Sequence, residues 1–245
     1  MEIDVAVYSI FRDNEGDYID KYFERLKKLK WDLGNIIIFA GEGDSEDATG
    51  NQLAMYEEHD DQLEIHMIKC DTGRKRMYHT PDPYRMQTRA ITGNAVYDAI
   101  SKHGKAMYVL HLESDLEYNE FLIANLHNTL IEYPDAGCVS PMVWVKENGI
   151  FRFYDQWAFR TLSGKMFPPL STIWYRKHRP NKPYKIQSSG SCVLFDANLL
   201  YVHSDIRLTY DEEIRGMTKK VREHGYDVLV DPNIAIVHPE GDYRT

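Results

Sequence analysis

The sequence has few cysteines, no internal repeat and no long apolar run, and each of these shortages excludes a class of protein. Cys70, Cys138 and Cys192 are the only cysteines in 245 residues, and they are far apart and form no CxxC pair. A disulfide framework and a cysteine zinc site are therefore excluded. We expect reduced thiols and a location in the cytoplasm, or in a host cytoplasm if the protein is viral. No stretch is apolar over enough residues to span a bilayer, and MEIDVAVYSIF at the N-terminus lacks the features of a secretory signal.

Positive charge is also scarce. The formal net charge is -9, so the molecule as a whole has no general attraction for nucleic acid. One segment differs: WYRKHRPNKPYK, residues 174–185, places five Lys or Arg among Trp174, Tyr175 and Tyr184. Such a segment could bind a phosphate-bearing acceptor, including nucleic acid, or it could be a solvated loop.

The apolar pattern alternates between strand and helix spacing. In the first half we expect strands over residues 3–10, 35–40, 63–68 and 106–112 and helices over 18–29 and 87–103. In the second half we expect a helix from after residue 120 to about 132 and a strand over 137–144, followed by an irregular stretch up to 185. Strands over 190–195 and 227–237, with a helix over 211–224 between them, complete the pattern. This order predicts one α/β domain over residues 1–245, with a mostly parallel central sheet flanked by helices. Ligands of such sheets bind beyond the carboxyl ends of the strands.

An acidic motif ends one of these strands. In YVLHLESDLEYNEF, residues 108–121, an apolar run is followed at once by Glu113, Ser114 and Asp115. Two carboxylates one residue apart can bind a hard divalent cation, Mg²⁺ or Mn²⁺, whose other positions a diphosphate can fill. A solvated acidic turn is the alternative interpretation.

This motif resembles the DxD motif of GT-A glycosyltransferases, with Glu113 in place of the first Asp. The resemblance implies that Asp115 and Glu113 are metal ligands and that Ser114 lies in the donor site. It also implies that His238, in IAIVHPEG at the end of the last expected strand, completes the metal shell. The alternative is that His238 has only a structural role. If it is a ligand, its imidazole would favour Mn²⁺ over Mg²⁺.

Three further segments follow the order of the same family: GEGDSEDATG (41–50), TRAITGNAVYDAI (88–100) and IQSSGSCVLF (186–195). The resemblance implies a base-reading residue, a basic residue and an amide near the nucleotide, and a small-residue loop at the donor sugar. The residues at these positions are Glu42, Arg89, Asn94, Ser189 and Gly190. A helix cap, solvent-facing helix residues and an ordinary small-residue loop are the respective alternatives.

Two last segments bear on the chemistry of transfer. LTYDEEIRG, residues 208–216, is similar to the xED motif that supplies the general base of inverting members, with Glu212 and Glu213 as candidates. Acids in a first helical turn are also favoured by the helix dipole alone. FRFYDQWAFR, residues 151–160, resembles the YDxWxxR region of Anp1-like and capsule-associated α-mannosyltransferases, which retain anomeric configuration, and it places Asp155 near the sugar. The stereochemical outcome therefore stays open.

Together these resemblances extend from Ile3 to His238. They imply an enzyme that moves a sugar from a UDP or GDP donor to a hydroxyl acceptor, most readily a saccharide or glycan. One alternative is a virus-type DNA glycosyltransferase that acts on hydroxymethylated bases. A nucleotidyltransferase and a non-catalytic sugar-nucleotide-binding domain are the others. The loop SIFRDNEGDY after the first strand, with a single Arg, speaks against a nucleotidyltransferase.

Overall fold

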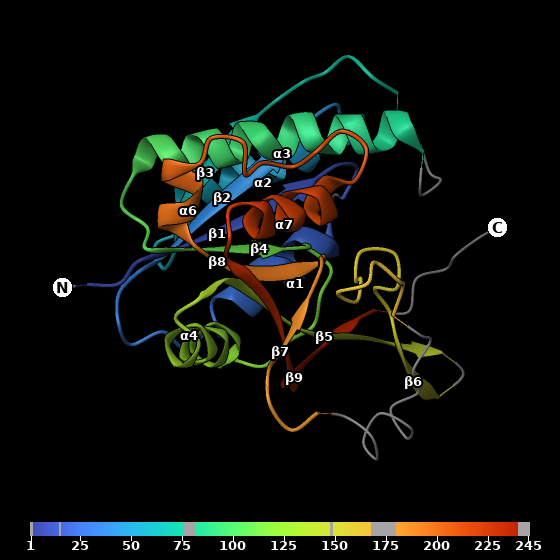
Figure 1. Cartoon of the computed structure of the whole chain (residues 1–245). Helices are drawn as coiled ribbons and strands as arrows, with labels where there is room; N and C mark the ends of the chain where they lie inside the picture. Colours follow the sequence, from blue (N-terminus) through green and yellow to red (C-terminus); the bar gives the residue numbers. More distant parts are fainter. Residues whose placement is uncertain (1, 15, 76–81, 148, 168–179, 240–245) are drawn as a thin grey trace.

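A computed structural model describes residues 2–14, 16–75, 82–147, 149–167 and 180–239 (Figure 1). The strands are β1 (Val5–Phe11), β2 (Ile36–Glu42), β3 (Glu64–Lys69), β4 (Tyr108–Leu112), β5 (Ala136–Glu147), β6 (Ile150–Phe153), β7 (Tyr184–Ile186), β8 (Cys192–Asp196) and β9 (Asp227–His238). The helices are α1 (Asp17–Leu26), α2 (Thr49–His59), α3 (Pro83–His103), α4 (Leu122–Glu132), α6 (Ala197–Val202) and α7 (Glu213–Glu223). Every strand and helix expected from the sequence is present, whereas α2, β6, β7 and α6 were not predicted.

The strands form one nine-stranded sheet in the order β3-β2-β1-β4-β8-β5-β9-β7, and β6 pairs with β5. Strands β1 to β4 are parallel to one another, and Val5 of β1 lies opposite Ile36 on one side and Tyr108 on the other. Strand β8 is antiparallel to both β4 and β5, and β9 is parallel to β5. Thus β5 and β9 share the direction of β1 to β4, while β6, β7 and β8 run the other way. The predicted α/β fold with a mostly parallel sheet is confirmed.

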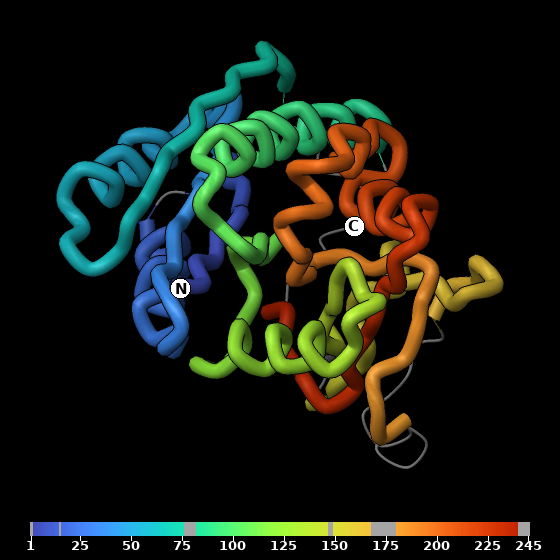
Figure 2. Tube along the Cα trace, turned by 60° about the vertical axis from the view of Figure 1, so that its left-hand side comes forward, coloured from blue at the N-terminus to red at the C-terminus, as the bar shows by residue number. Residues whose placement is uncertain are grey.

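Helices cover both faces of this sheet, and successive residues of β1, which point to opposite sides, are nearly all buried. On one side Tyr8 stacks on Tyr97 of α3, with ring centroids 4.7 Å apart. On the other side Tyr22 of α1 donates a hydrogen bond to Ser9 Oγ over 2.8 Å. Figures 1 and 2 both show α3 along one side of the sheet and α4 along the other. The core therefore lies on both faces of the sheet, where side chains of the strands pack against those of the helices.

The strand order creates a switch point beside β1. The chain passes from β1 to β2 and β3 in one direction and then returns to add β4 on the other side of β1. Helices that leave neighbouring strands in opposite directions open a crevice at the carboxyl ends of those strands. In this chain the crevice lies where β1 ends at Phe11 and β4 ends at Leu112. Within the described ranges, no helix has the length and apolar character needed to cross a membrane.

Candidate functional site

A cavity of about 320 Å³ lies at the carboxyl ends of β1, β4 and β9. This volume is at the small end of the range found for small-molecule sites. Both signs of charge line it, with the cations Arg12, Lys75, Arg85 and Arg89 and the acids Glu113 and Asp115, beside His238. The lining therefore suits a ligand that brings negative charge together with a metal cation.

Glu113, Asp115 and His238 converge on one side of this cavity. Each offers one ligand atom, and these atoms all lie within 4.8 Å of one another. His238 Nε2 is 3.0 Å from Asp115 Oδ2. Asp115 Oδ1 is buried and has no hydrogen-bond partner among the described residues. A buried carboxylate oxygen without a partner is costly, so this oxygen fits a ligand that the protein itself does not supply.

The ring of His238 is held from two sides. It stacks on Tyr154 with centroids 3.9 Å apart, and its Nδ1 lies 2.8 Å from the carbonyl oxygen of Pro239. Since a carbonyl can only accept, Nδ1 carries a proton, and in the neutral ring Nε2 then has its lone pair directed toward Asp115. Two acceptors 3.0 Å apart require a proton or a cation between them. The residues present thus fit a divalent metal ion.

Backbone pairing brings these ligands together from distant parts of the chain. Glu117 and Val237 exchange hydrogen bonds of 2.7 and 2.8 Å, which joins the segment after β4 to the end of β9. The backbone N–H of Glu113 donates to the carbonyl oxygen of Ser191 over 2.8 Å. The positions of Glu113, Asp115 and His238 are therefore set by the sheet and the contacts at its edge.

Arg89 links the acidic cluster to α7. Its Nη2 is 3.1 Å from Glu113 Oε1, and its Nε is 3.4 Å from Glu213 Oε2. Glu213 is buried at the start of α7 with a φ of 48°, a conformation that is unusual for a residue other than glycine. Burial raises the pKa of Glu213, although Arg89 and Arg85 act in the opposite direction. Glu213 thus belongs to the same charge network as Glu113.

Glu212 points into a different network. Its carboxylate accepts hydrogen bonds from Arg215 and from Lys219 Nζ, the latter 2.7 Å away. Burial alone would raise the pKa of Glu212, but the bonds from Lys219 and Arg215 outweigh it and lower the pKa. Neither glutamate lines the cavity itself. Of the two predicted bases, only Glu213 is joined through Arg89 to Glu113.

Asp155 lies buried beside the small-residue loop. Ser191 Oγ donates to Asp155 Oδ2 over 2.7 Å. Burial, with the charge of Glu113 in addition, raises the pKa of Asp155 to about 7. A Cβ on Gly190 would lie 2.5 Å from Ala158 Cβ and 2.9 Å from Asp155 Oδ2. The close approach that requires glycine here is therefore to residues 155–158, rather than to an open donor site.

Three predicted donor-site residues have protein partners instead. Ser189 is fully buried and its Oγ accepts from Ser140 Oγ over 2.7 Å. The side-chain amide of Asn94 pairs with the backbone N–H and carbonyl of Leu208 at 2.9 and 3.0 Å. Glu42, 3% exposed, accepts from the backbone N–H of Ser45 at 3.0 Å. None of the three lines the cavity, and each has a hydrogen-bond partner within the protein.

Ser114, by contrast, does line the cavity, and its Oγ lies 3.0 Å from the hydroxyl of Tyr18. Arg25 Nη2 donates to the carbonyl oxygen of Ser114 over 3.3 Å. These contacts from α1 fix the backbone between the two acidic ligands.

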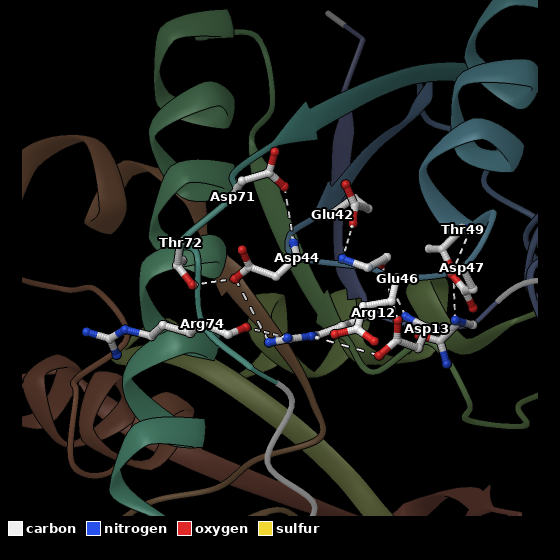
Figure 3. Close-up of polar contacts among 12 residues, drawn as sticks. Arg12, Asp13, Glu42, Asp44, Glu46, Asp47, Thr49, Asp71, Thr72 and Arg74 are labelled. Atoms are coloured by element: carbon white, nitrogen blue, oxygen red, sulfur yellow. Dashed lines mark hydrogen bonds and ion pairs between the residues drawn. The ribbon is translucent and has the colours of Figure 1, made fainter.

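Asp44 joins the three loops that follow β1, β2 and β3 (Figure 3). It accepts hydrogen bonds from Thr72 Oγ1 and from the backbone N–H of Gly73, the latter over 2.7 Å. Arg12 reaches the same place, with Nη1 3.9 Å from Asp44 Oδ2 and Nη2 2.5 Å from the carbonyl oxygen of Arg74. This loop network holds Arg12 at the wall of the cavity.

Arg12, Lys75, Arg85 and Tyr154 are cavity residues that sequence reasoning did not propose. Arg85 could have been found, because it lies four residues before Arg89 and thus on the same face of α3. Tyr154 adjoins Asp155 inside a segment already singled out, whereas a loop residue such as Lys75 carries no periodic signal. Of the basic aromatic segment 174–185, residues 174–179, with Trp174, lie outside the described residues.

No family model and no curated protein matches this sequence. Solved structures do match. A mannosyltransferase from Pyrobaculum calidifontis in complex with GDP-Man and Mn²⁺ has a TM-score of 0.64 and 15% identity, and the match covers 100% of this chain and 59% of that one. Residues 1–349 of TarS from S. aureus with UDP give 0.63 and 14%, over 98% and 61% of the two chains. GalNAc-T7 with UDP, GalNAc and Mn²⁺ gives 0.60 and 13%, over 98% and 44%.

At this level of identity the likeness concerns the fold. The chain has the α/β fold of GT-A glycosyltransferases, as the sequence predicted. It spans 61% or less of the length of each of these three structures.

Proposed function

We propose that this chain is a metal-dependent glycosyltransferase that moves a sugar from a nucleotide-sugar donor, with UDP or GDP as the nucleotide, to a hydroxyl acceptor. The observation that carries the proposal is the convergence of Glu113, Asp115 and His238 on one cavity, with a buried oxygen of Asp115 left without a partner. The solved structures of the same fold support it, because one contains GDP-Man with Mn²⁺ and another contains UDP with Mn²⁺.

Glu113, Asp115 and His238 would hold Mn²⁺, or Mg²⁺, and the imidazole favours Mn²⁺. When bound, the cation neutralises charge on the departing nucleotide diphosphate. The described residues contribute further positive charge, since Arg12, Lys75 and Arg85 line the same cavity. Guanidinium groups can form charge-assisted pairs with phosphate oxygens. These side chains therefore bind and orient the diphosphate.

Glu213 is the proposed proton acceptor for an inverting reaction. Its raised pKa brings the carboxylate nearer to the range in which a general base works well at neutral pH. Asp155, whose pKa is about 7, is proposed to contact hydroxyl groups of the donor sugar. The resemblance of its segment to retaining mannosyltransferases makes the anomeric configuration of the product the deciding measurement, and a retained product excludes a simple base role for Glu213.

We propose a saccharide or glycan as the acceptor. Hydroxymethylated DNA is the second candidate, because the sequence of residues 174–185 combines five basic residues with three aromatic ones. The net charge of -9 favours the saccharide. An enzyme acting on a base in a duplex would also have to move that base out of the stack, at a cost of a few kcal/mol.

Calorimetry and donor hydrolysis test the donor site. The wild-type protein should bind at least one UDP- or GDP-sugar in the presence of Mn²⁺, bind nucleoside triphosphates more weakly, and hydrolyse the sugar nucleotide slowly. Asp115→Asn, which keeps the side-chain shape, should lower the hydrolysis rate by about 100-fold or more, because it weakens the metal site. Asp61→Asn, at an exposed acid outside the cavity, is the matched control.

Absence of sugar-nucleotide binding would refute the proposal, and so would full activity of Asp115→Asn at saturating donor and metal. Preference for a nucleoside triphosphate would favour the nucleotidyltransferase alternative. For the acceptor, labelled sugar is offered to a saccharide panel and to single- and double-stranded hydroxymethylcytosine DNA. No incorporation into DNA, under conditions where the donor is hydrolysed, would end the DNA candidate.

A further inference from the structure

A second group of side chains with metal-ligating atoms lies outside the cavity, on strand β3 and at the last residue of α3. Glu64 and His66 are two residues apart on β3, so their side chains leave the same face of the sheet. His103 ends α3 and reaches the same point. Strand β3 is the edge of the sheet. The three side chains therefore join an edge strand to the end of the longest described helix.

The donor atoms of these residues are already close together. His66 Nε2 and His103 Nε2 are 2.9 and 3.4 Å from the same oxygen, Glu64 Oε1. All three ligand atoms lie within 4.8 Å of one another. In a tetrahedral zinc site, ligand atoms about 2.1 Å from the metal are themselves ~3.4 Å apart. Small movements of side chains are thus enough to place one ion among all three.

The surroundings hold the two imidazole rings in place. Phe39, which is buried, stacks on His66 with centroids 5.0 Å apart and meets His103 edge-on at 5.5 Å. The side chains of Glu64, His66 and His103 are 49, 39 and 17% exposed, so an ion can enter and a water molecule can take the fourth position. Two imidazoles and a carboxylate suit Zn²⁺ better than Mg²⁺ or Ca²⁺, which prefer oxygen ligands.

A second pair of histidines near the surface, His203 and His224, offers a comparison with the Glu64 group. His203 and His224 stack at 4.0 Å, and His224 Nε2 lies 2.8 Å from Asp205 Oδ1. Their ligand atoms nevertheless do not form a group of three that could hold one ion. In the described part of the chain, only the Glu64 group and the cluster at the cavity meet that condition.

We propose that Glu64, His66 and His103 form a structural Zn²⁺ site that fastens the end of α3 to edge strand β3. The ion would close the chain between residues 64 and 103, and the segment after β3 contributes Lys75 to the cavity while α3 contributes Arg85 and Arg89. Zn²⁺ bound to the folded state only would also stabilise it by mass action. This site is independent of the proposed transferase activity.

Zinc titration of chelator-treated protein tests the proposal. Because the cavity cluster can also bind zinc, the titrations use the Asp115→Ala/His238→Ala protein as background. This protein should bind one Zn²⁺, and zinc at 100 times the dissociation constant should raise its melting temperature by about 5–10 °C. Adding His66→Ala or His103→Ala should weaken zinc binding by at least about tenfold, since even outer-shell partners contribute that much.

His224→Ala in the same background is the matched control and should leave zinc affinity unchanged. Co²⁺ provides a second readout, because visible absorption from a protein-bound ion should vanish with His103→Ala. Circular dichroism checks that each variant is folded, and His66→Gln replaces His66→Ala if the latter is not. A background protein that binds no zinc would overturn the proposal. The proposal would also be overturned if the His66 and His103 variants bound zinc as tightly as the background protein. It would be overturned as well if His224→Ala weakened zinc binding as much as they do.

Discussion

Replacing Arg89 with methionine removes the guanidinium group that lies between Glu113 and Glu213, and we expect this change to destabilise the fold. The two contacts are 3.1 and 3.4 Å long. Methionine keeps most of the length and the helix propensity of arginine. The change therefore removes mainly the charge, and it leaves Glu113 and Glu213 with Arg85 as the nearby cation in place of their direct ion pairs with Arg89.

The size of the effect follows from burial. The side chain of Glu213 is 8% exposed, that of Glu113 is 23% exposed and that of Arg89 is 28% exposed. Breaking a buried ion pair by removing one partner costs about 3–5 kcal/mol, because an unpaired charge stays behind. Partial exposure of Arg89 places the expected loss at the lower end, about 3 kcal/mol. For a chain of this length that corresponds to a melting temperature lower by roughly 6–12 °C.

Urea unfolding followed by circular dichroism measures the loss, and a double-mutant cycle assigns it. Glu213→Gln alone should change stability less than Arg89→Met, because burial disfavours the charge that it removes and Arg89 keeps its contact with Glu113. The Arg89→Met/Glu213→Gln protein should lose less stability than the sum of the single variants, with a coupling of about 1 kcal/mol or more.

Lys30→Met is the matched control. It breaks a 2.6 Å ion pair with Glu120 in which the two side chains are 55 and 41% exposed. Such surface pairs contribute about 0–1 kcal/mol. If Arg89→Met lost no more stability than Lys30→Met, or if the cycle gave no coupling, the buried network would not contribute as argued.

Three further predictions follow from the same contacts. Glu213→Gln should abolish sugar transfer while donor binding survives, and Glu212→Gln should leave transfer largely intact. Calorimetry measures donor binding and product assays measure transfer. Equal losses of transfer in the two variants would contradict this prediction. Asn94→Ala should lower the free energy of unfolding by about 1–3 kcal/mol, because the backbone N–H and carbonyl of Leu208 lose their partners, while donor affinity measured by calorimetry stays unchanged. Burial alone would raise the pKa of Asp44, but the hydrogen bonds that its carboxylate accepts outweigh burial, so the pKa in the folded protein is lowered. The contribution of Asp44 to stability is therefore present above the unfolded pKa of about 3.9. It is lost as the pH falls through the pKa of the folded state. Asp44→Asn should therefore flatten the acid side of the stability profile in urea unfolding, and an unchanged profile would refute this.

The α/β fold could be predicted because local strand and helix patterns indicate it. The grouping of Glu113, Asp115 and His238 was expected from the resemblance of their segments to the GT-A family, and their ligand atoms do lie within 4.8 Å of one another. The elements that were not predicted carry weak patterns. In α2 only Thr49 and Leu53 are buried, β7 has three residues, and α6 has six.

The roles of individual side chains were less predictable, since they depend on partners distant in the chain. Asn94 was expected near the nucleotide, but the backbone of Leu208 occupies its amide. Glu212 and Glu213 are neighbours with the same side chain. Glu213 has a positive φ and contacts Arg89, whereas Glu212 does neither. Neither a remote backbone partner nor a single dihedral angle leaves a signal in the sequence.

The bridge between Glu117 and Val237 has a consequence for how the proposed metal affinity would arise during folding. Asp115 and His238 are separated by half of the chain, and they meet only when β9 has paired with β5 and its end has joined the segment after β4. Contacts between such distant residues form late, because a long loop must close first. High-affinity binding of Mn²⁺ would therefore report that β9 has joined β5 and the segment after β4, and a partly folded chain that lacks β9 would offer two carboxylates without the imidazole.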